Sequence, residues 1–254
     1  MSVKVIIGIS HKTYFGYART RRWCEEVAAI LRRRGGAGEG MELFTFPAMP
    51  AIAASLAAFA DSGMAVGAQN VCAAPAGAWT GESSAAMLRE MGCRYVEIGH
   101  AERRRYFAES AAEINQKLDR AFECGLTPVI CIGEASEMPM QEAAAFAIAQ
   151  ADELLARRKP PLPPLIFAWE PQWAIGAPAP ASDDYIRYVC RALRAELRQR
   201  FGPQCRVIYG GSAGPGLLGR LWPDVDGIFL GRFAHQPSAL EAILNEAGEI
   251  VCAR

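Results

Sequence analysis

Three side chains of this chain could together move a proton beside a carbonyl group. Lys12 supplies a cation, His100 an imidazole and Glu170 a carboxylate, and each stands at the end of a short apolar run. A carboxylate can remove a proton from carbon, while an imidazole and an ammonium can stabilise the negative charge that develops on oxygen. Taken singly, the lysine is explained as a solvated loop residue and the histidine as a structural one. Their placement on a repeating pattern of strands and helices therefore carries the interpretation.

The sequence around each of these residues indicates how it would be tuned. Glu170 follows the run 165–169, and its apolar and aromatic neighbours should raise the pKa of the carboxyl group by desolvation. The residues after His100 are typical of a short helix that begins there, and a helix N-terminus disfavours the imidazolium form. A neutral imidazole can donate a hydrogen bond to a carbonyl and pass protons between two oxygens. Lys12 is expected to bind an anionic substrate.

Glycines follow several of the strand-like runs and could form a cradle for an anion. Gly176 comes shortly after Glu170, residues 209–212 read Tyr-Gly-Gly-Ser, and residues 230–232 read Leu-Gly-Arg. Glycine turns expose backbone N–H groups, and phosphate sites after the seventh and eighth strands are common in (β/α)8 barrels. Either of the last two, taken alone, is explained equally well as a plain tight turn. Trp173 could anchor a loop that closes over the substrate and expels water.

Short β-rich runs alternate with amphipathic helical stretches along the chain. Most runs are nearly continuous apolar segments, which is typical of strands buried on both faces of a parallel sheet. Eight strands, each followed by a helix, in 254 residues predict an α/β fold, a single-domain (β/α)8 barrel over residues 1–254. The expected strands are 3–9, 43–46, 64–68, 95–98, 128–132, 165–169, 207–209 and 227–230. The expected helices include 19–33, 111–123, 141–157 and 183–200.

A doubly wound open sheet is the alternative architecture. It usually has fewer strands at this length and often carries a G-x-G-x-x-G fingerprint after its first strand. Here the first run leads into Gly-Ile-Ser-His-Lys at residues 8–12. The barrel is therefore favoured. Because its active site forms at the carboxyl ends of the strands, Lys12, His100 and Glu170 should face one mouth.

Composition argues against several classes of function. Hydrophobic residues make up 51% of the chain and charged residues 21%, and the formal net charge is zero, so neither nucleic acid nor a membrane surface is favoured as a partner. The sequence contains no apolar run long enough to span a membrane, and residues 1–9 resemble a strand more than a signal peptide. The eight cysteines show neither C-x-x-C pairs nor Cys/His metal spacing. We therefore expect a cytoplasmic protein with reduced thiols and no metal.

With these residues in place, the chain resembles the triosephosphate isomerase family nearly end to end. The motifs that carry the resemblance are Gly67-Ala68-Gln69-Asn70, Gly77-Ala78-Trp79-Thr80-Gly81-Glu82, Gly99-His100-Ala101-Glu102-Arg103-Arg104, Cys131-Ile132-Gly133-Glu134, Glu170-Pro171-Gln172-Trp173-Ala174-Ile175-Gly176, Tyr209-Gly210-Gly211-Ser212 and Asp226-Gly227. The resemblance implies a single TIM barrel that needs neither a metal nor an organic cofactor. It also implies a homodimer, in which the loop around Trp79-Thr80-Gly81 lies near the partner's active site.

The resemblance implies a role for each residue of the site. Glu170 would take the proton from the carbon beside the carbonyl, His100 would be the neutral electrophile, and Lys12 would hold the substrate and its developing charge. Glu102 would support the lysine. The residues expected to bind the substrate or its phosphate are Ser10, Gly176, Ser212, Gly231 and Arg232.

The chain departs from the family pattern at residues that shape the pocket. Ser10 stands where the family usually has asparagine, and Ala101 stands where it usually has serine. The loop that follows Glu170 is the expected lid over the substrate. It carries Pro178 and Pro180, each of which fixes a backbone φ angle. Arg232 replaces the second glycine of a Gly-Gly pair and adds bulk and positive charge near the expected phosphate.

Three functions stay open at this point. The first is the interconversion of dihydroxyacetone phosphate and glyceraldehyde 3-phosphate through an enediol(ate), the reaction of glycolysis and gluconeogenesis. The second is the same chemistry on a four-carbon ketose phosphate such as erythrulose phosphate, which some relatives isomerise. The third belongs to another class: the altered lid and Arg232 would suit a non-catalytic barrel that binds a phosphorylated metabolite.

Overall fold

Parallel strands alternate with helices along the chain. The computed structural model describes residues 4–253, so Val3, where the first strand was expected to begin, lies outside the described residues. The strands are β1 (Val5–Ser10), β2 (Met41–Phe46), β3 (Met64–Ala68), β4 (Tyr95–Ile98), β5 (Thr127–Ile132), β6 (Leu165–Trp169), β7 (Cys205–Tyr209) and β8 (Gly227–Leu230). The α-helices are α1 (Tyr17–Arg33), α2 (Ile52–Ala58), α3 (Ala85–Met91), α4 (Ala101–Tyr106), α5 (Ala111–Glu123), α6 (Met140–Leu155), α7 (Asp183–Phe201), α8 (Leu217–Leu221) and α9 (Pro237–Cys252). Short 3-10 helices are η1 (Met49–Ala51), η2 (Gln172–Ala174) and η3 (Arg232–His235).

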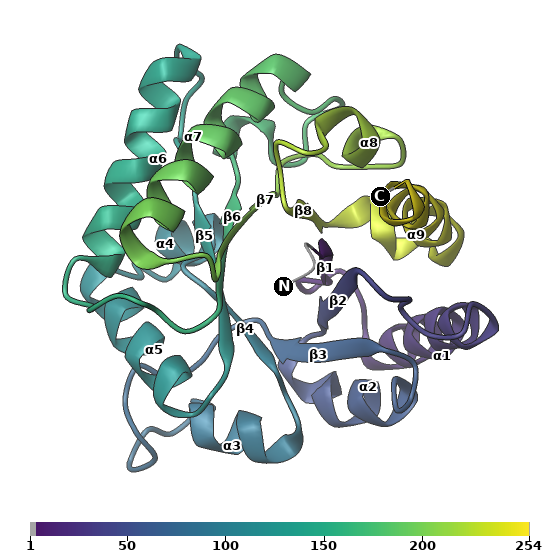
Figure 1. Ribbon diagram of the computed structural model, residues 1–254. Helices are drawn as coiled ribbons and strands as arrows, with labels where there is room; N and C mark the ends of the chain where they lie inside the picture. Colours follow the sequence, from purple (N-terminus) through teal and green to yellow (C-terminus); the bar gives the residue numbers. More distant parts are fainter. Residues whose placement is uncertain (1–3, 254) are drawn as a thin grey trace.

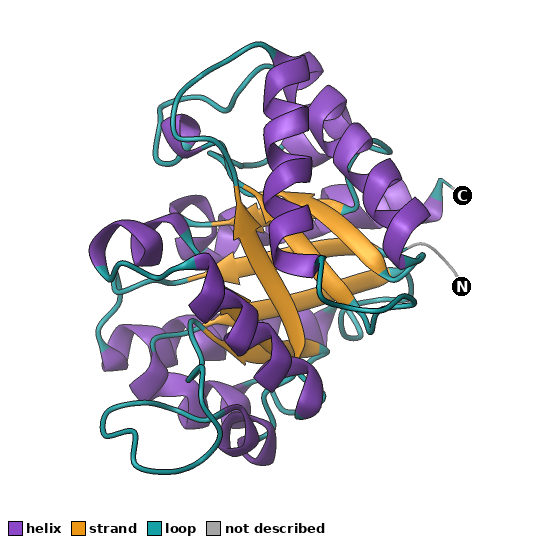
Figure 2. Cartoon of the chain, turned by 90° about the vertical axis from the view of Figure 1, so that its left-hand side faces the viewer, coloured by secondary structure: helices purple, strands orange, loops and turns teal. Residues whose placement is uncertain are grey.

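β1 closes the barrel by pairing with both β2 and β8. Ile6 is in register with Glu42 on one side and with Gly227 on the other. Each strand pairs in parallel with its neighbours in chain order, from β1 to β8 (Figure 1). The helices surround the strands on the outside (Figure 2). The expected single-domain (β/α)8 barrel is thereby confirmed, and the open doubly wound sheet is excluded.

Aromatic rings fill the barrel interior beneath the mouth. Phe44, Phe46 and Phe229 are buried, and their ring centroids lie 5.3 to 6.3 Å apart. Gly8 of β1 faces these rings: a Cβ atom there would lie 2.3 Å from Phe44 and 2.8 Å from Phe229. The glycine therefore makes room for the rings. The packed rings separate the mouth from the opposite end of the barrel.

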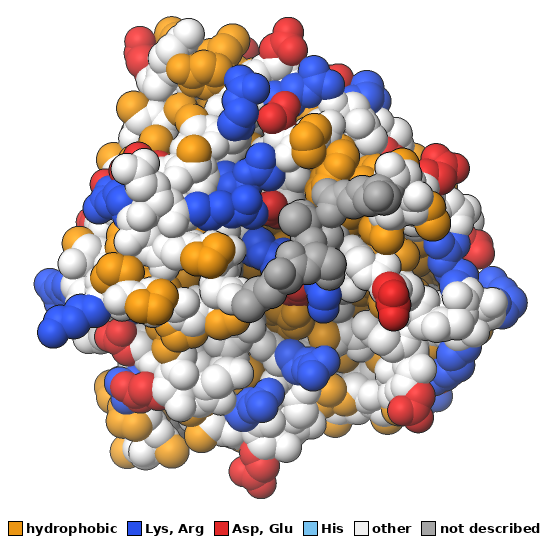
Figure 3. Space-filling model, in the orientation of Figure 1, with side chains coloured by type: hydrophobic (Ala, Val, Ile, Leu, Met, Phe, Trp, Pro, Cys, Tyr) orange, Lys and Arg blue, Asp and Glu red, His pale blue; other side chains and the backbone are white. Residues whose placement is uncertain are grey.

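Helix α7 illustrates how the sequence builds the outer layer. Ser182 caps the helix by accepting a hydrogen bond from the backbone N–H of Tyr185 (3.3 Å), and Asp183 in the first turn complements the helix dipole. Ile186 and Leu193, which are two helical turns apart, are fully buried. On the outer surface, acidic and basic side chains are interspersed (Figure 3), in keeping with the zero net charge.

No helix within residues 4–253 is both long enough and apolar enough to cross a membrane. In the same part of the chain, no group of three or more His, Cys, Asp and Glu side chains is placed to hold a metal ion.

Replacing Phe44 with alanine tests the packing of the barrel interior. The variant should lose about 3–5 kcal/mol in the free energy of unfolding, because it leaves a cavity beside rings that cannot fully collapse. The matched control is Phe146→Ala on α6, where the side chain is 41% exposed; its loss should stay below about 1 kcal/mol. Denaturant unfolding followed by circular dichroism measures both, and equal losses would contradict a close-packed interior.

Candidate active site

Glu170 lies in a tightly packed part of the barrel mouth. It follows β6 and is 4% exposed, and its backbone N–H donates to the carbonyl of Ile132 (2.8 Å). Two glycines pack against it. A Cβ atom at Gly210 would lie 2.5 Å from the Glu170 Cγ, and one at Gly133 would lie 2.0 Å from the Glu170 carbonyl oxygen. Gly133 therefore restricts the position of the Glu170 backbone, and Gly210 restricts the position of its carboxylate.

His100 is the N-cap of α4, and the helix sets which ring nitrogen carries the proton. Nδ1 accepts a hydrogen bond from the backbone N–H of Glu102 (3.1 Å), which leaves the proton of the neutral ring on Nε2. Nε2 lies 3.3 Å from Oε2 of Glu170. The two atoms are not aligned for a hydrogen bond, and among the described residues this Oε2 has no other hydrogen-bond partner. His100 and Glu170 line the same cavity.

Burial is the main cause of the shifted pKa values of both groups. It lowers the pKa of His100 to about 4, and the positive charge of Lys12 acts in the same direction, so the ring is neutral at pH 7. Burial raises the pKa of Glu170 well above its usual value; the negative charge of Glu97 adds to this shift, and Lys12 opposes it. A basic carboxylate thus stands beside a neutral imidazole, as the sequence predicts.

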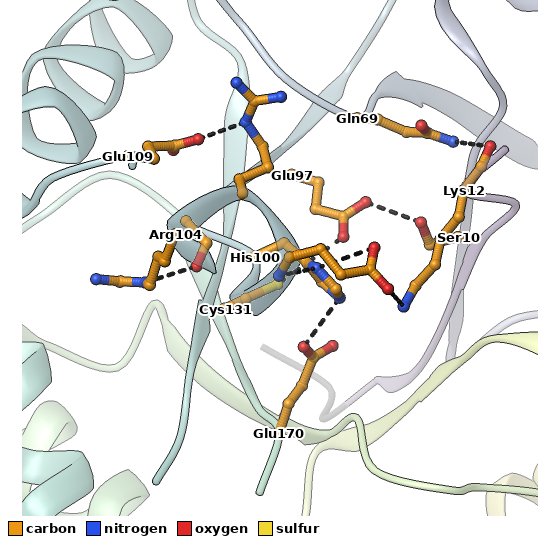
Figure 4. Close-up of polar contacts among 12 residues, drawn as sticks. Ser10, Lys12, Gln69, Glu97, His100, Arg104, Glu109, Cys131 and Glu170 are labelled. Atoms are coloured by element: carbon orange, nitrogen blue, oxygen red, sulfur yellow. Dashed lines mark hydrogen bonds and ion pairs between the residues drawn. The ribbon is translucent and has the colours of Figure 1, made fainter. Parts of the chain in front are cut away.

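Lys12 reaches the same point from β1. Its Nζ lies 2.6 Å from Oε1 of Glu102, so the expected lysine–glutamate contact is present. Burial lowers the pKa of Lys12, but the hydrogen bond to Glu102 and the charge of Glu170 outweigh it, so the pKa is raised and the amine stays charged. The backbone of Lys12 is left-handed (φ 48°), a conformation that costs about 1–3 kcal/mol, and Gln69 donates to its carbonyl (3.0 Å). Figure 4 shows the side chains of Lys12, His100 and Glu170 converging.

The residues expected to bind phosphate line the cavity that also contains Lys12, His100 and Glu170. They are Gly176, Ser212, Gly231 and Arg232. The Ser212 hydroxyl donates to the carbonyl of Ala177 (2.8 Å), and the Arg232 guanidinium donates to the carbonyl of Gly176 (3.0 Å). The positive charge of Arg232 thus lies at this end of the cavity, as expected, and its side chain also touches the lid.

Ser10 lines the cavity, but its hydroxyl is engaged by a residue that the sequence did not single out. The hydroxyl donates to Oε2 of Glu97 (2.9 Å), and both residues are 3% exposed (Figure 4). Burial raises the pKa of Glu97 to about 7, although the Ser10 hydrogen bond and Lys12 lower it. The signal in the sequence was a lone carboxyl group inside the otherwise apolar run 95–98.

Glu134 is a second residue whose structural role the sequence does not predict. It is fully buried and accepts hydrogen bonds from the indole N–H groups of Trp169 (3.1 Å) and Trp173 (3.1 Å) and from the hydroxyl of Tyr185 (3.0 Å). Glu134 therefore ties the start of the lid to β6 and α7. The sequence marked this position through a family motif, and Trp173 is anchored as expected.

Comparison with known proteins agrees with this geometry. The family model described as triosephosphate isomerase matches residues 5–247. The chain is 48% identical to L-erythrulose-1-phosphate isomerase of Pectobacterium atrosepticum over 250 residues, which cover 97% of this chain and 96% of that protein. It is 34% identical to triosephosphate isomerase of Thermus thermophilus, covering 96% and 99% of the two chains. It is 36% identical to the enzyme of the same name from Symbiobacterium thermophilum, covering 88% and 90%. The chain therefore belongs to the triosephosphate isomerase family of sugar-phosphate isomerases.

Proposed function

We propose that this protein isomerises a four-carbon ketose phosphate by moving the carbonyl between two adjacent carbons through an enediol(ate). The observation that carries the proposal is Oε2 of Glu170, which has no hydrogen-bond partner within residues 4–253 and lies 3.3 Å from the protonated Nε2 of a neutral His100. A base and an electrophile so placed suit the transfer of a proton next to a carbonyl. Triosephosphate isomerase is itself an established case of this pairing.

In the proposed mechanism each group of the site has one task. Glu170 removes the proton from the carbon beside the carbonyl and returns it to the neighbouring carbon. The Nε2–H of His100 donates to the carbonyl oxygen and passes protons between the two oxygens of the enediol(ate). Lys12 balances the negative charge that develops on oxygen. Gly176, Ser212, Gly231 and Arg232 hold the phosphate at the other end of the cavity.

The choice of a four-carbon substrate rests on the relatives and on Ser10. Identity to the erythrulose phosphate isomerase is 48%, against 34% and 36% for the two triosephosphate isomerases. Ser10 is shorter than the asparagine usual at this position and leaves more room beside the reacting carbons. Triose phosphate is the second candidate, because the reacting groups are those of the whole family. The unpaired base speaks against a non-catalytic binding barrel.

We further propose that the protein is a homodimer. Trp79 is 56% exposed, and Tyr106 and Phe107, which are 66% and 68% exposed, line a cavity that also contains Lys12. Exposed aromatic side chains around a cavity are typical of protein interfaces. The Trp79 loop of one subunit would cover this aromatic rim on the other.

A cytoplasmic location is also proposed. All eight cysteines lie within the described residues, and all are free thiols. Unpaired cysteines are typical of a reducing compartment.

Side-by-side kinetics with erythrulose phosphates and dihydroxyacetone phosphate test the proposed function. The four-carbon substrates should give the higher kcat/KM. Glu170→Gln should lower kcat about 10²–10⁴-fold, because it removes the base, while phosphate ligands still bind. Glu90→Gln, an exposed change on α3, is the control and should leave kcat as it is. Near-normal turnover in Glu170→Gln would reject the base assignment, and a preference for triose phosphate would reject the substrate.

The pH dependence of kcat/KM tests the state of the two central groups, because it reports the free enzyme, to which the pKa values given above belong. Glu170 acts only when deprotonated and its pKa is raised, so kcat/KM, calculated for the dianionic form of the substrate phosphate, should fall about tenfold per pH unit below an inflection well above pH 4.5. His100 stays neutral down to about pH 4 and should contribute nothing to this limb. A kcat/KM that stays constant from pH 8 to pH 5 contradicts the raised pKa.

The mass in solution tests the dimer. Sedimentation at micromolar concentration should give twice the mass of one chain, and Trp79→Asp should shift the mass toward one chain by placing a charge in the interface. Phe146→Asp, on the exposed face of α6, is the control and should keep the double mass. A wild-type protein with the mass of a single chain counts against the interface.

A further inference from the structure

The top layer of the barrel interior is polar on the side of β1, β4 and β5. Side chains alternate along a strand, so Glu97 faces inward like Tyr95, whose ring stacks on Phe44 with centroids 4.5 Å apart. Ser10 faces inward like Gly8 for the same reason. Cys131 of β5 belongs to the same interior cluster. These three side chains therefore lie above the aromatic rings, at the floor of the mouth.

Glu97 has hydrogen-bonding capacity left on this floor. Its Oε2 accepts the hydroxyl hydrogen of Ser10 at 2.9 Å, whereas the thiol of Cys131 is 4.0 Å from its Oε1. A thiol is a weak donor, and a carboxylate has about four acceptor positions on its two oxygens. Because Glu97 is only 3% exposed, little of this capacity is met by bulk water. A polar group that enters the mouth would find an acceptor there.

Two adjoining cavities meet at the reacting groups. One contains the phosphate cradle and Glu170, and the other contains Glu97; the residues that line both include Ser10, Lys12 and His100. In Figure 4 the carboxylates of Glu97 and Glu170 lie on opposite sides of the His100 ring. A ligand with its phosphate in the cradle and its carbonyl at His100 would therefore point its far end toward Ser10 and Glu97.

The chemistry of a four-carbon ketose phosphate fits this arrangement. When the phosphate is on a terminal carbon, a hydroxymethyl group forms the opposite end of the molecule. The carbonyl moves between the two inner carbons, so this hydroxymethyl group lies beyond the reacting carbons as seen from the phosphate. A triose phosphate has no carbon at this place.

We propose that Ser10 and Glu97 form a hydroxyl-binding subsite that holds the terminal hydroxymethyl group of a four-carbon ketose phosphate. The proposal rests on the proposed isomerase function and assigns the chain-length preference of the site to these two residues. The substrate hydroxyl donates to a Glu97 oxygen, and the Ser10 hydroxyl keeps that carboxyl group in place. Sites that hydrogen-bond a substrate hydroxyl discriminate strongly against analogues that lack it, because their buried polar group is then left unpaired.

Chain-length selectivity in variants of the subsite tests the proposal. The measured quantity is the ratio of kcat/KM for erythrulose phosphate to that for dihydroxyacetone phosphate. Glu97→Leu should lower this ratio about tenfold or more, and Ser10→Ala should lower it less. Glu97→Ala also removes both acceptor oxygens and should lower the ratio by a similar factor, so it carries the test if the leucine variant does not fold.

The control is Asp226→Asn, another buried carboxyl group, which precedes β8 at the opposite end of the barrel and pairs with Arg194 and Arg198. The Asp226→Asn variant should have the same ratio of kcat/KM values as the wild type, even if it is less stable. An equal fall of both kcat/KM values in the Ser10 and Glu97 variants would overturn the subsite and leave only a structural role.

A binding measurement separates failure of the subsite from failure of the proposed function. In the Glu170→Gln background, calorimetry gives the Kd of each ligand without turnover. The Glu97 substitutions should weaken erythrulose phosphate more than dihydroxyacetone phosphate, again by about tenfold. If the wild type turns over no four-carbon substrate, the proposed function is wrong, and the subsite is then judged from the Kd ratio alone. A Kd ratio that the Glu97 substitutions leave unchanged would overturn the subsite.

Discussion

A carboxylate that must remove a proton from carbon has to be kept from water, and the position of Glu170 depends on this requirement. Packed phenylalanine rings lie below the site, Gly210 brings backbone against the Glu170 side chain, and Gly133 packs against the Glu170 backbone carbonyl. A side chain at Gly210 would push the carboxylate away, and one at Gly133 would displace the backbone that carries it. The close approach thus combines a raised pKa with a fixed position, and both serve proton transfer.

The charge around this carboxylate is balanced by one ammonium. Lys12 stands among Glu97, Glu102 and Glu170, and each of these carboxylates raises its pKa. The first turn of α4 links this balance to His100, because the backbone N–H of Glu102 fixes the ring tautomer while the Glu102 carboxylate holds the lysine. One residue of this helix, Glu102, thus sets the state of both electrophiles. The strained backbone of Lys12 is tolerated because Gln69 and Glu102 hold the residue at its carbonyl and its amine.

Much of the barrel could be predicted because buried parallel strands are short apolar runs and their carboxyl ends share one mouth. This rule brought Lys12, His100 and Glu170 together from three distant parts of the chain. The contact between Ser10 and Glu97 could not be predicted in this way. It joins residues 87 positions apart, and it depends on the stagger of the strands, which decides which inward side chains share a layer. The direction of a side chain on a loop cannot be predicted from the sequence either. Arg232 is therefore expected near the phosphate, but its hydrogen bond to the Gly176 carbonyl is not.

The lid shows what the departures from the family pattern do physically. It is bonded at three points, through the Gly176 carbonyl to Arg232, the Ala177 carbonyl to Ser212, and the Ala181 N–H to the Tyr209 hydroxyl (3.3 Å). The prolines between these points fix φ at two positions, so fewer open conformations are lost when the lid closes. Arg232 also holds the lid, through its hydrogen bond to the Gly176 carbonyl. The glycine usual in the family at this position has no side chain that could make this bond. Its guanidinium has five N–H donors, so a bond to the lid leaves donors over for an anion in the cradle. Arg232 therefore both adds positive charge at the phosphate end of the cavity and links that end to the lid.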